Sequence, residues 1–258
     1  MQKAILISGV LLIVATSCIK NIICINGNGD LQTAGRIAAS FNQAVNTTSV
    51  NVVYRRADST SITITAESNL IPHIITVVNS GRLEIRTDPR NACFDASQTP
   101  LVSITSPELN ILELTGSGNF QADTLSGSAV EIRSTGSGDL SLDVITCEEL
   151  DINLTGSGSA EIINATCNEA TLSGTGSGDL TISGNGETLD VQTTGSGSME
   201  ALGFMFTTVK ARVTGSGNIH THVLNSLNAV ITGSGNIYVR GNPVINQTIT
   251  GSGKIIKQ

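Results

Sequence analysis

Two carboxylates in this sequence, Glu131 and Asp151, stand twenty residues apart at positions where they could do acid–base chemistry. Each stands four residues before a Thr-Gly-Ser-Gly motif, so in a structure with this period they share a column on neighbouring turns. Neighbouring strands lie about 4.8 Å apart, and carboxyl groups about 5 Å apart are typical of retaining glycosidases. Outward strand positions are usually only charged, however, and the chain has no Trp to stack on a sugar. The pattern therefore favours a solvated acidic face, with a carbohydrate-active enzyme, a polysaccharide lyase or hydrolase, as the alternative.

Other candidate sites are weaker. His220 and His222 are two residues apart and face the same side of a strand, as two metal ligands could, but no third ligand is evident. A calcium column would need an acidic residue after every motif, whereas Asn, Asp, Ser and Lys all occur there. No nucleophile-elbow context surrounds any Ser. We therefore expect ordinary exposed histidines, no catalytic residues, no cofactor and no metal.

Five cysteines have to be placed, namely Cys18, Cys24, Cys93, Cys147 and Cys167. Cys147 and Cys167 each stand eight residues before the Thr of a motif, hence in one column on neighbouring turns. Stacked Cα atoms about 4.8 Å apart lie within disulfide range, so the pair is either a disulfide or two stacked thiols. Inward stacking as small apolar groups is slightly favoured.

The N-terminus has the pattern of an export signal. Lys3 supplies a positive start, residues 4–15 are almost wholly apolar, and Ala15-Thr16-Ser17-Cys18 resembles a bacterial lipobox. We predict a signal peptide over 1–17 and lipidation of Cys18, with ordinary cleavage a few residues later as the alternative. The protein is then exported to the outer membrane, the cell surface or the periplasm.

The element that must position all these residues is an internal repeat. Thr-Gly-Ser-Gly occurs eight times, beginning at Thr115 and ending at Thr250, with spacings of 20, 20, 20, 19, 20, 18 and 18 residues. The positions three and five residues before each motif are largely apolar, and the positions between them are polar. Two glycines allow positive φ at a sharp corner, and stacked Thr and Ser could form hydroxyl ladders. An antiparallel meander would place turns at alternate ends, so we prefer a parallel coil.

The fold class predicted is therefore all-β, a single-stranded parallel β-helix or solenoid with rungs of about 20 residues. The repeat covers 109–258, and 18–108 reads as an irregular β-rich cap with the first irregular coils. Within the cap we expect strands over 49–56 and 61–67, a turn or short helix over 69–73, and a hairpin pairing 74–78 with 82–86.

Charge limits the partners. The formal net charge is -7, and the 14 Lys and Arg residues are scattered along the sequence. Nucleic acid and anionic lipid both require clustered basic residues, so neither is expected, and membrane contact is expected only through the N-terminal lipid. The chain ends on an unpaired edge at 255–258, where lysines oppose edge-to-edge growth or a homo-oligomer forms.

The sequence resembles the auto-transporter adhesin head GIN domain family. The segments that carry the resemblance are 25–30 (INGNGD), 67–74 (ESNLIPHI), 104–109 (ITSPEL) and the repeated GSGN or GSGD corners. It departs in Lys254 at the last corner and Gly27-Asn28-Gly29 at the start. The resemblance implies a parallel β-helix, export and adhesion without an established activity. The function predicted is a non-catalytic envelope adhesin or scaffold for a surface glycan or protein, with a periplasmic regulatory protein as a further alternative.

Overall fold

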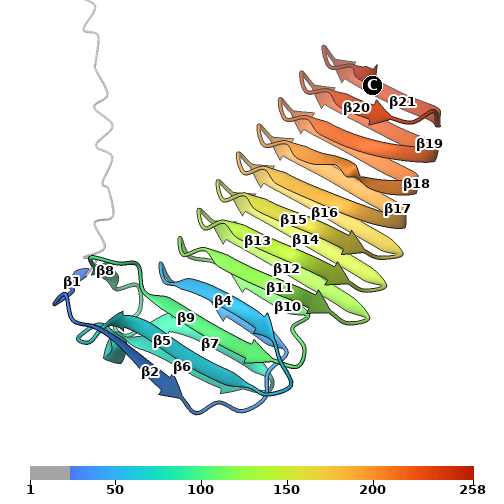
Figure 1. Ribbon diagram of the computed structural model, residues 1–258. Helices are drawn as coiled ribbons and strands as arrows, with labels where there is room; N and C mark the ends of the chain where they lie inside the picture. The colour runs from blue at the N-terminus through green and yellow to red at the C-terminus, as the bar shows by residue number, and fades with distance from the viewer. Residues whose placement is uncertain (1–23) are drawn as a thin grey trace, which may run out of the picture.

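The computed structural model describes residues 24–258 as an elongated stack of coils with an irregular cap at its N-terminal end (Figure 1). The predicted signal peptide and Cys18 lie outside the described residues. Within them, no helix has the length and apolar character needed to cross a membrane.

Strands account for almost all of the regular structure. The cap contains β1 (Cys24–Asn26), β2 (Leu31–Arg36), β3 (Gln43–Asn46), β4 (Asn51–Arg56), β5 (Ser61–Glu67), the 3-10 turn η1 (Ile71–His73), β6 (Ile74–Asn79), β7 (Arg82–Thr87), β8 (Cys93–Asp95) and β9 (Leu101–Ser106). The repeat contains β10 (Ile111–Leu114), β11 (Phe120–Ser126), β12 (Ala129–Gly136), β13 (Leu140–Thr146), β14 (Glu149–Gly156), β15 (Ala160–Thr166), β16 (Glu169–Gly176), β17 (Leu180–Gly195), β18 (Met199–Gly215), β19 (Ile219–Gly233), β20 (Ile237–Arg240), β21 (Val244–Gly251) and β22 (Ile255–Lys257). The all-β prediction is confirmed.

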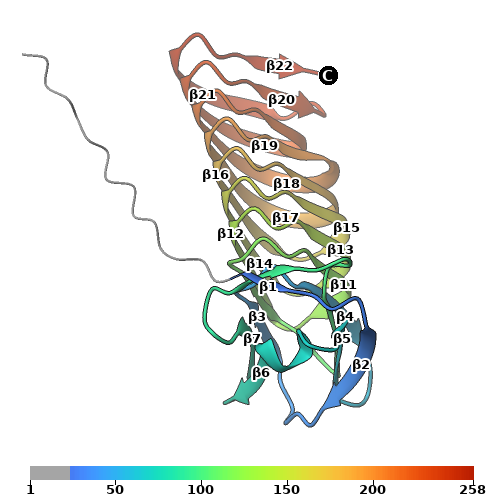
Figure 2. The same ribbon diagram turned by 90° about the vertical axis from the view of Figure 1, so that its left-hand side faces the viewer.

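Strands that precede each corner pair in parallel with one another, from β10 through β12, β14 and β16 to β21. Strands that follow each corner form a second parallel ladder, from β11 through β13 and β15 to β22. The long strands β17, β18 and β19 run through both ladders (Figure 2). The parallel solenoid is thus confirmed, and the antiparallel meander is wrong for the repeat.

The cap continues these ladders and then closes them. β3 pairs in parallel with β10, and β4 pairs in parallel with β11. β7 and β9 extend the ladders in parallel with β3 and β4. Beyond these strands the pairing becomes antiparallel, between β7 and β6 and along β9, β5 and β2. The predicted hairpin is confirmed, and its turn residues Ser80 and Gly81 have φ of 49° and 77°, as a two-residue type I′ turn requires.

Inward positions of each coil fill a narrow apolar core. Ile132 and Ile152 before the corner and Leu140 after it are buried, as the sequence parity predicts. The alternation of inward and outward residues then shifts by one position, because Asp143 and Val144 are both exposed and Ile145 is buried. Two consecutive outward residues bend the strand, which gives the coil an additional side. The repeat period does not reveal this bend.

Both glycines of the corner are required, for different reasons. The first glycine adopts positive φ, 123° at Gly156, as predicted. The second approaches the previous coil so closely that a Cβ at Gly158 would collide with the carbonyl oxygen of Gly138. The N–H groups of Ser157 and Gly158 both donate to the Gly136 carbonyl, at 3.0 and 3.2 Å. The corner is therefore fixed by stacking as well as by its turn.

Candidate functional site

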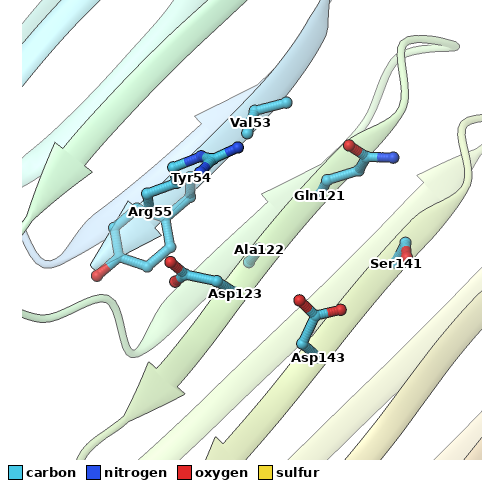
Figure 3. Close-up of a pocket in the computed structure, with 8 residues that line it drawn as sticks. All are labelled: Val53, Tyr54, Arg55, Gln121, Ala122, Asp123, Ser141 and Asp143. Atoms are coloured by element: carbon cyan, nitrogen blue, oxygen red, sulfur yellow. The ribbon is translucent and has the colours of Figure 1, made fainter.

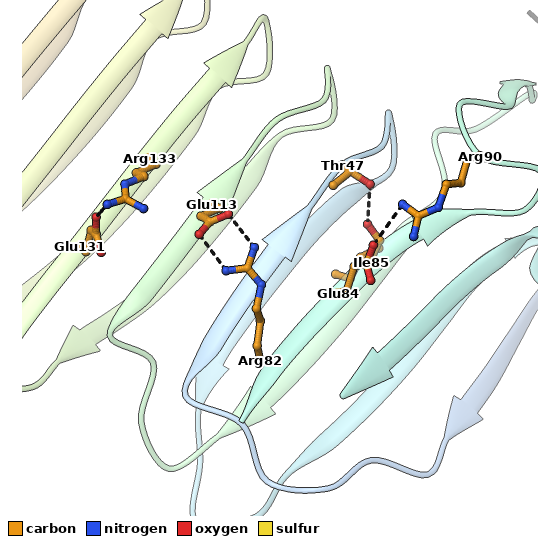
Figure 4. A network of polar contacts seen from close by, with 8 residues as sticks. All are labelled: Thr47, Arg82, Glu84, Ile85, Arg90, Glu113, Glu131 and Arg133. Atoms are coloured by element: carbon orange, nitrogen blue, oxygen red, sulfur yellow. Dashed lines mark hydrogen bonds and ion pairs between the residues drawn. The ribbon is translucent and has the colours of Figure 1, made fainter. Parts of the chain in front are cut away.

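The outward residues of β12, β14, β16 and the later halves of β17 to β19 form what we call the first face. Glu131 on β12 is paired in register with Asp151 on β14, so the predicted column exists. Glu131 forms an ion pair with Arg133 on its own strand (Figure 4), and Asn153 Nδ2 donates to Asp151 Oδ1 at 2.8 Å. Each carboxylate therefore has a separate polar partner two residues along its strand.

An open groove of about 360 Å³ runs across this column. Its lining includes Glu131, Glu149, Asp151 and Glu169 from three successive coils. A glycosidase acid depends on an apolar pocket that favours its protonated form, whereas this groove is acidic and solvated. The arrangement is suited to contact with a ligand on the surface and does not enclose a substrate.

A second hollow, of about 280 Å³, lies where β4 meets β11 and β13. Figure 3 shows Asp123 and Asp143 on the neighbouring strands β11 and β13, beside Tyr54. The Tyr54 hydroxyl donates to the Ser106 carbonyl at 3.1 Å, and burial raises the pKa of this phenol. Asp123 Oδ1 accepts from the Arg56 N–H at 3.0 Å. The Asp123 bond thus joins the cap to the repeat, whereas the Tyr54 bond lies within the cap.

The outward residues of β11, β13, β15, the first halves of β17 to β19, β20 and β22 form the second face. His220 and His222 lie there, both half-buried. His220 Nδ1 lies 3.2 Å from Glu200 Oε2, and its ring centroid lies 4.2 Å from that of Tyr238. Across residues 24–258, no three His, Cys, Asp or Glu side chains are grouped to hold a metal ion.

The paired cysteines lie in the predicted column. Cys147 is half-buried, Cys167 is buried, and both are free thiols in the structure. Burial raises the pKa of Cys147 to about 11 and that of Cys167 to about 12. Neither thiol is therefore a nucleophile near neutral pH. Whether the pair is bonded or only stacked stays a prediction.

The positions after each GSG form a hydrogen-bonded ladder. A side-chain oxygen at this position accepts the backbone N–H of the equivalent residue one coil later. The acceptor pairs are Asn119 with Asp139, Asp139 with Ser159, Ser159 with Asp179, Asp179 with Ser198, Asn218 with Asn236 and Asn236 with Lys254, at 2.7–3.3 Å. Turn propensity suggested only that these residues suit a corner. The ladder explains why three residue types serve equally, since each supplies an acceptor.

A second feature was not predicted. Cys24 and Cys93 form a disulfide with Cα atoms 4.5 Å apart, between β1 and β8. Nearby, the buried Glu67 carboxylate accepts hydrogen bonds from the Gly29 N–H and from the Ser97 N–H and hydroxyl, at 2.5, 2.7 and 2.8 Å. These bonds lower the pKa of Glu67. Together they fasten the N-terminal segment to the cap.

The fold and its open polar outer faces define a β-solenoid protein. The chain belongs to the family described as putative auto-transporter adhesin, head GIN domain, which matches residues 40–182 and 160–243.

Solved structures share the fold. A putative adhesin from Parabacteroides distasonis is 25% identical with a TM-score of 0.85, covering 91% of this chain and 100% of that one. A putative adhesin from Parabacteroides merdae is 24% identical with a TM-score of 0.83, covering 92% and 99%. A putative lipid binding protein from Parabacteroides distasonis is 23% identical with a TM-score of 0.78, covering 91% and 99%. No curated protein matches the sequence.

Proposed function

We propose that this protein is an exported, non-catalytic binding module of the cell envelope that contacts a surface glycan or protein through its outward faces. One observation carries the proposal: the coils are filled by apolar side chains, while polar side chains line the outside in regular columns. A ligand therefore meets the solenoid from outside. Membership of an adhesin family supports the same function.

Within the second face, Tyr238 and His220 form the strongest candidate contact. Their rings are stacked and half-buried, in the part of the solenoid far from β1 (Figure 1). Aromatic residues supply much of the binding energy of interfaces, because they bury a large area with few rotatable bonds.

The experiment is a glycan and host-matrix binding screen with the exported protein. We expect a ligand whose affinity falls about tenfold or more in Tyr238→Ala. The matched control is Gln121→Ala, which occupies the same outward column near the cap. Equal binding by wild type and Tyr238→Ala would place the contact elsewhere. Absence of any ligand in the screen would count against the binding function itself.

The registered pair Glu131 and Asp151 supports one second candidate, a carbohydrate-active enzyme. Polysaccharide breakdown by the wild type that is abolished in both Glu131→Gln and Asp151→Asn would favour the enzyme. Binding without breakdown would favour the module. Glu161→Gln, an exposed carboxylate of the second face, is the matched control.

A further inference from the structure

Basic residues gather at the C-terminal end of the solenoid. From residue 199 onward the chain has five Lys and Arg residues and a single acidic side chain, whereas residues 109–198 have one Arg and thirteen acidic side chains. The five cations, all exposed, are Lys210, Arg212, Arg240, Lys254 and Lys257. The net charge of -7 conceals this uneven distribution, because acidic side chains of the earlier coils outnumber the basic side chains of the C-terminal end.

These cations are available to a partner. Ion pairs made by Arg in the described chain lie in the cap and first coils, at Arg82, Arg90 and Arg133 (Figure 4). The one acidic side chain of the basic end, Glu200, faces His220 instead. Lys257 Nζ donates to Asn242 Oδ1 at 3.4 Å, which leaves its charge uncompensated.

The same end exposes apolar side chains of the last coil. Val244, in an outward column, is 70% exposed, and Ile249, in an inward column of the last coil, is 38% exposed. A hollow of about 380 Å³ opens there, lined by Pro243, Ile245, Gln247, Ile255 and Lys257. The end therefore combines apolar surface with lysines.

Another coil or a second copy stacked on this end is disfavoured by three residues. Gln247 and Lys257 occupy inward columns that hold Ala229 and Val239 one coil earlier. A stacked coil would bury the Lys257 charge, which is costly without a partner. Lys254 also ends the ladder, since its side chain has no oxygen to accept the next N–H.

We propose that this open end docks on an anionic lipid bilayer surface. Lysines near such a surface are attracted to its charged headgroups, and their apolar stems lie along apolar surroundings. Val244 and Ile249 are then covered by the interfacial region, which a soluble polyanion would not do. The acidic coils are repelled, so the solenoid meets the surface end-on. The sequence-based expectation against lipid docking considered only a basic stripe along the chain, whereas stacking gathers distant cations at one end.

This inference deepens the proposed function by naming the surface that one end of the module meets. Its test is flotation of the exported protein with phosphatidylcholine vesicles that contain either no anionic lipid or about 30% phosphatidylglycerol. Every protein carries Cys18→Ser, so no lipid attached at that residue contributes. We expect binding only to anionic vesicles, weakened at about 0.5 M salt by charge screening.

The decisive variant combines Lys254→Gln with Lys257→Gln. Its partitioning onto the anionic vesicles should fall about thirty-fold. Val244→Ser should weaken binding further by removing apolar contact. The matched control, Arg86→Gln with Arg90→Gln, removes two cations from the cap and should bind as wild type. Circular dichroism and the urea midpoint verify that each variant is folded.

Equal flotation of wild type and the double lysine variant would overturn the proposal. So would binding to soluble polygalacturonate with no binding to vesicles, or a dimer that the lysine substitutions dissociate. The result is separable from the proposed function, because Tyr238→Ala should lose glycan or protein binding and keep vesicle binding. The double lysine variant should show the reverse.

Discussion

The backbone N–H of Asp139 donates to Asn119 Oδ1 at 3.0 Å, although the two residues are twenty positions apart in the sequence. The same bond recurs one coil later, where the Ser159 N–H donates to Asp139 Oδ1 at 2.9 Å. The corner column is thus a polar spine in which a side chain accepts a backbone N–H of the following coil, with one break between Ser198 and Asn218. Lys254 receives such a bond, and its own side chain has no oxygen to accept another.

The spine predicts that substitutions at equivalent corner positions lower the free energy of unfolding by different amounts. Asp139→Ala leaves the Ser159 N–H without its acceptor, so we expect unfolding to become easier by about 1 kcal/mol. Asp139→Asn keeps an acceptor and should be close to neutral. Lys254→Ala removes no acceptor and should also be close to neutral. Urea unfolding followed by circular dichroism measures all three, and a costly Lys254→Ala would contradict this account of the spine.

The sequence predicted the solenoid because period and parity are local properties of the chain. Glu131 and Asp151 could be placed in one column for that reason, but their partners Arg133 and Asn153 belong to the neighbouring outward column. The bend at Asp143 and Val144 was not predicted, because a shift in the alternation of inward and outward residues is recognised only from the burial of the side chains. The Cys24–Cys93 bridge joins cap strands that lie outside the repeat, so no spacing indicated it.

The second glycine of the corner provides another prediction. Gly158→Ala places a methyl group against the Gly138 carbonyl oxygen of the previous coil. Because the backbone of both coils would have to move, we expect a loss of about 3 kcal/mol. Gly35→Ala is the matched control, since a Cβ there meets no atom within 4 Å. Thermal unfolding should separate the two variants clearly, and similar melting temperatures would refute the stacking argument.

Glu67 predicts a pH dependence at the cap. Its pKa lies below the ordinary 4.5 because the Gly29 N–H and the Ser97 N–H and hydroxyl donate to its carboxylate. The ionised form therefore stabilises the folded state fully above pH 4.5, and this contribution is lost as the pH falls through the lowered pKa.

Wild type should accordingly lose stability on acidification more steeply than Glu67→Gln, whose side chain does not titrate. Glu84→Gln, which alters an exposed ion pair with Arg90, should keep the wild-type slope. Urea midpoints between about pH 3 and 7 measure the difference. Parallel pH profiles for wild type and Glu67→Gln would show that the carboxylate does not hold the cap.

Two buried threonines should respond to the same substitution with opposite signs. Thr193 is 2% exposed, and its hydroxyl donates to the Gly197 carbonyl at 2.8 Å. Thr221 is fully buried, and its Oγ1 has no hydrogen-bond partner among the described residues. Replacement by Val is nearly isosteric, so the hydroxyl is the main difference.

Thr193→Val leaves a buried carbonyl unsatisfied and should cost about 1–2 kcal/mol, whereas Thr221→Val removes an unpaired polar atom and should stabilise by about 1 kcal/mol. Urea unfolding of both variants in parallel gives the two signs. A destabilised Thr221→Val would mean that its hydroxyl is satisfied, for instance by a buried water between neighbouring coils. The apolar column would then contain a hydration site at the point where Val239 and Ala201 flank Thr221.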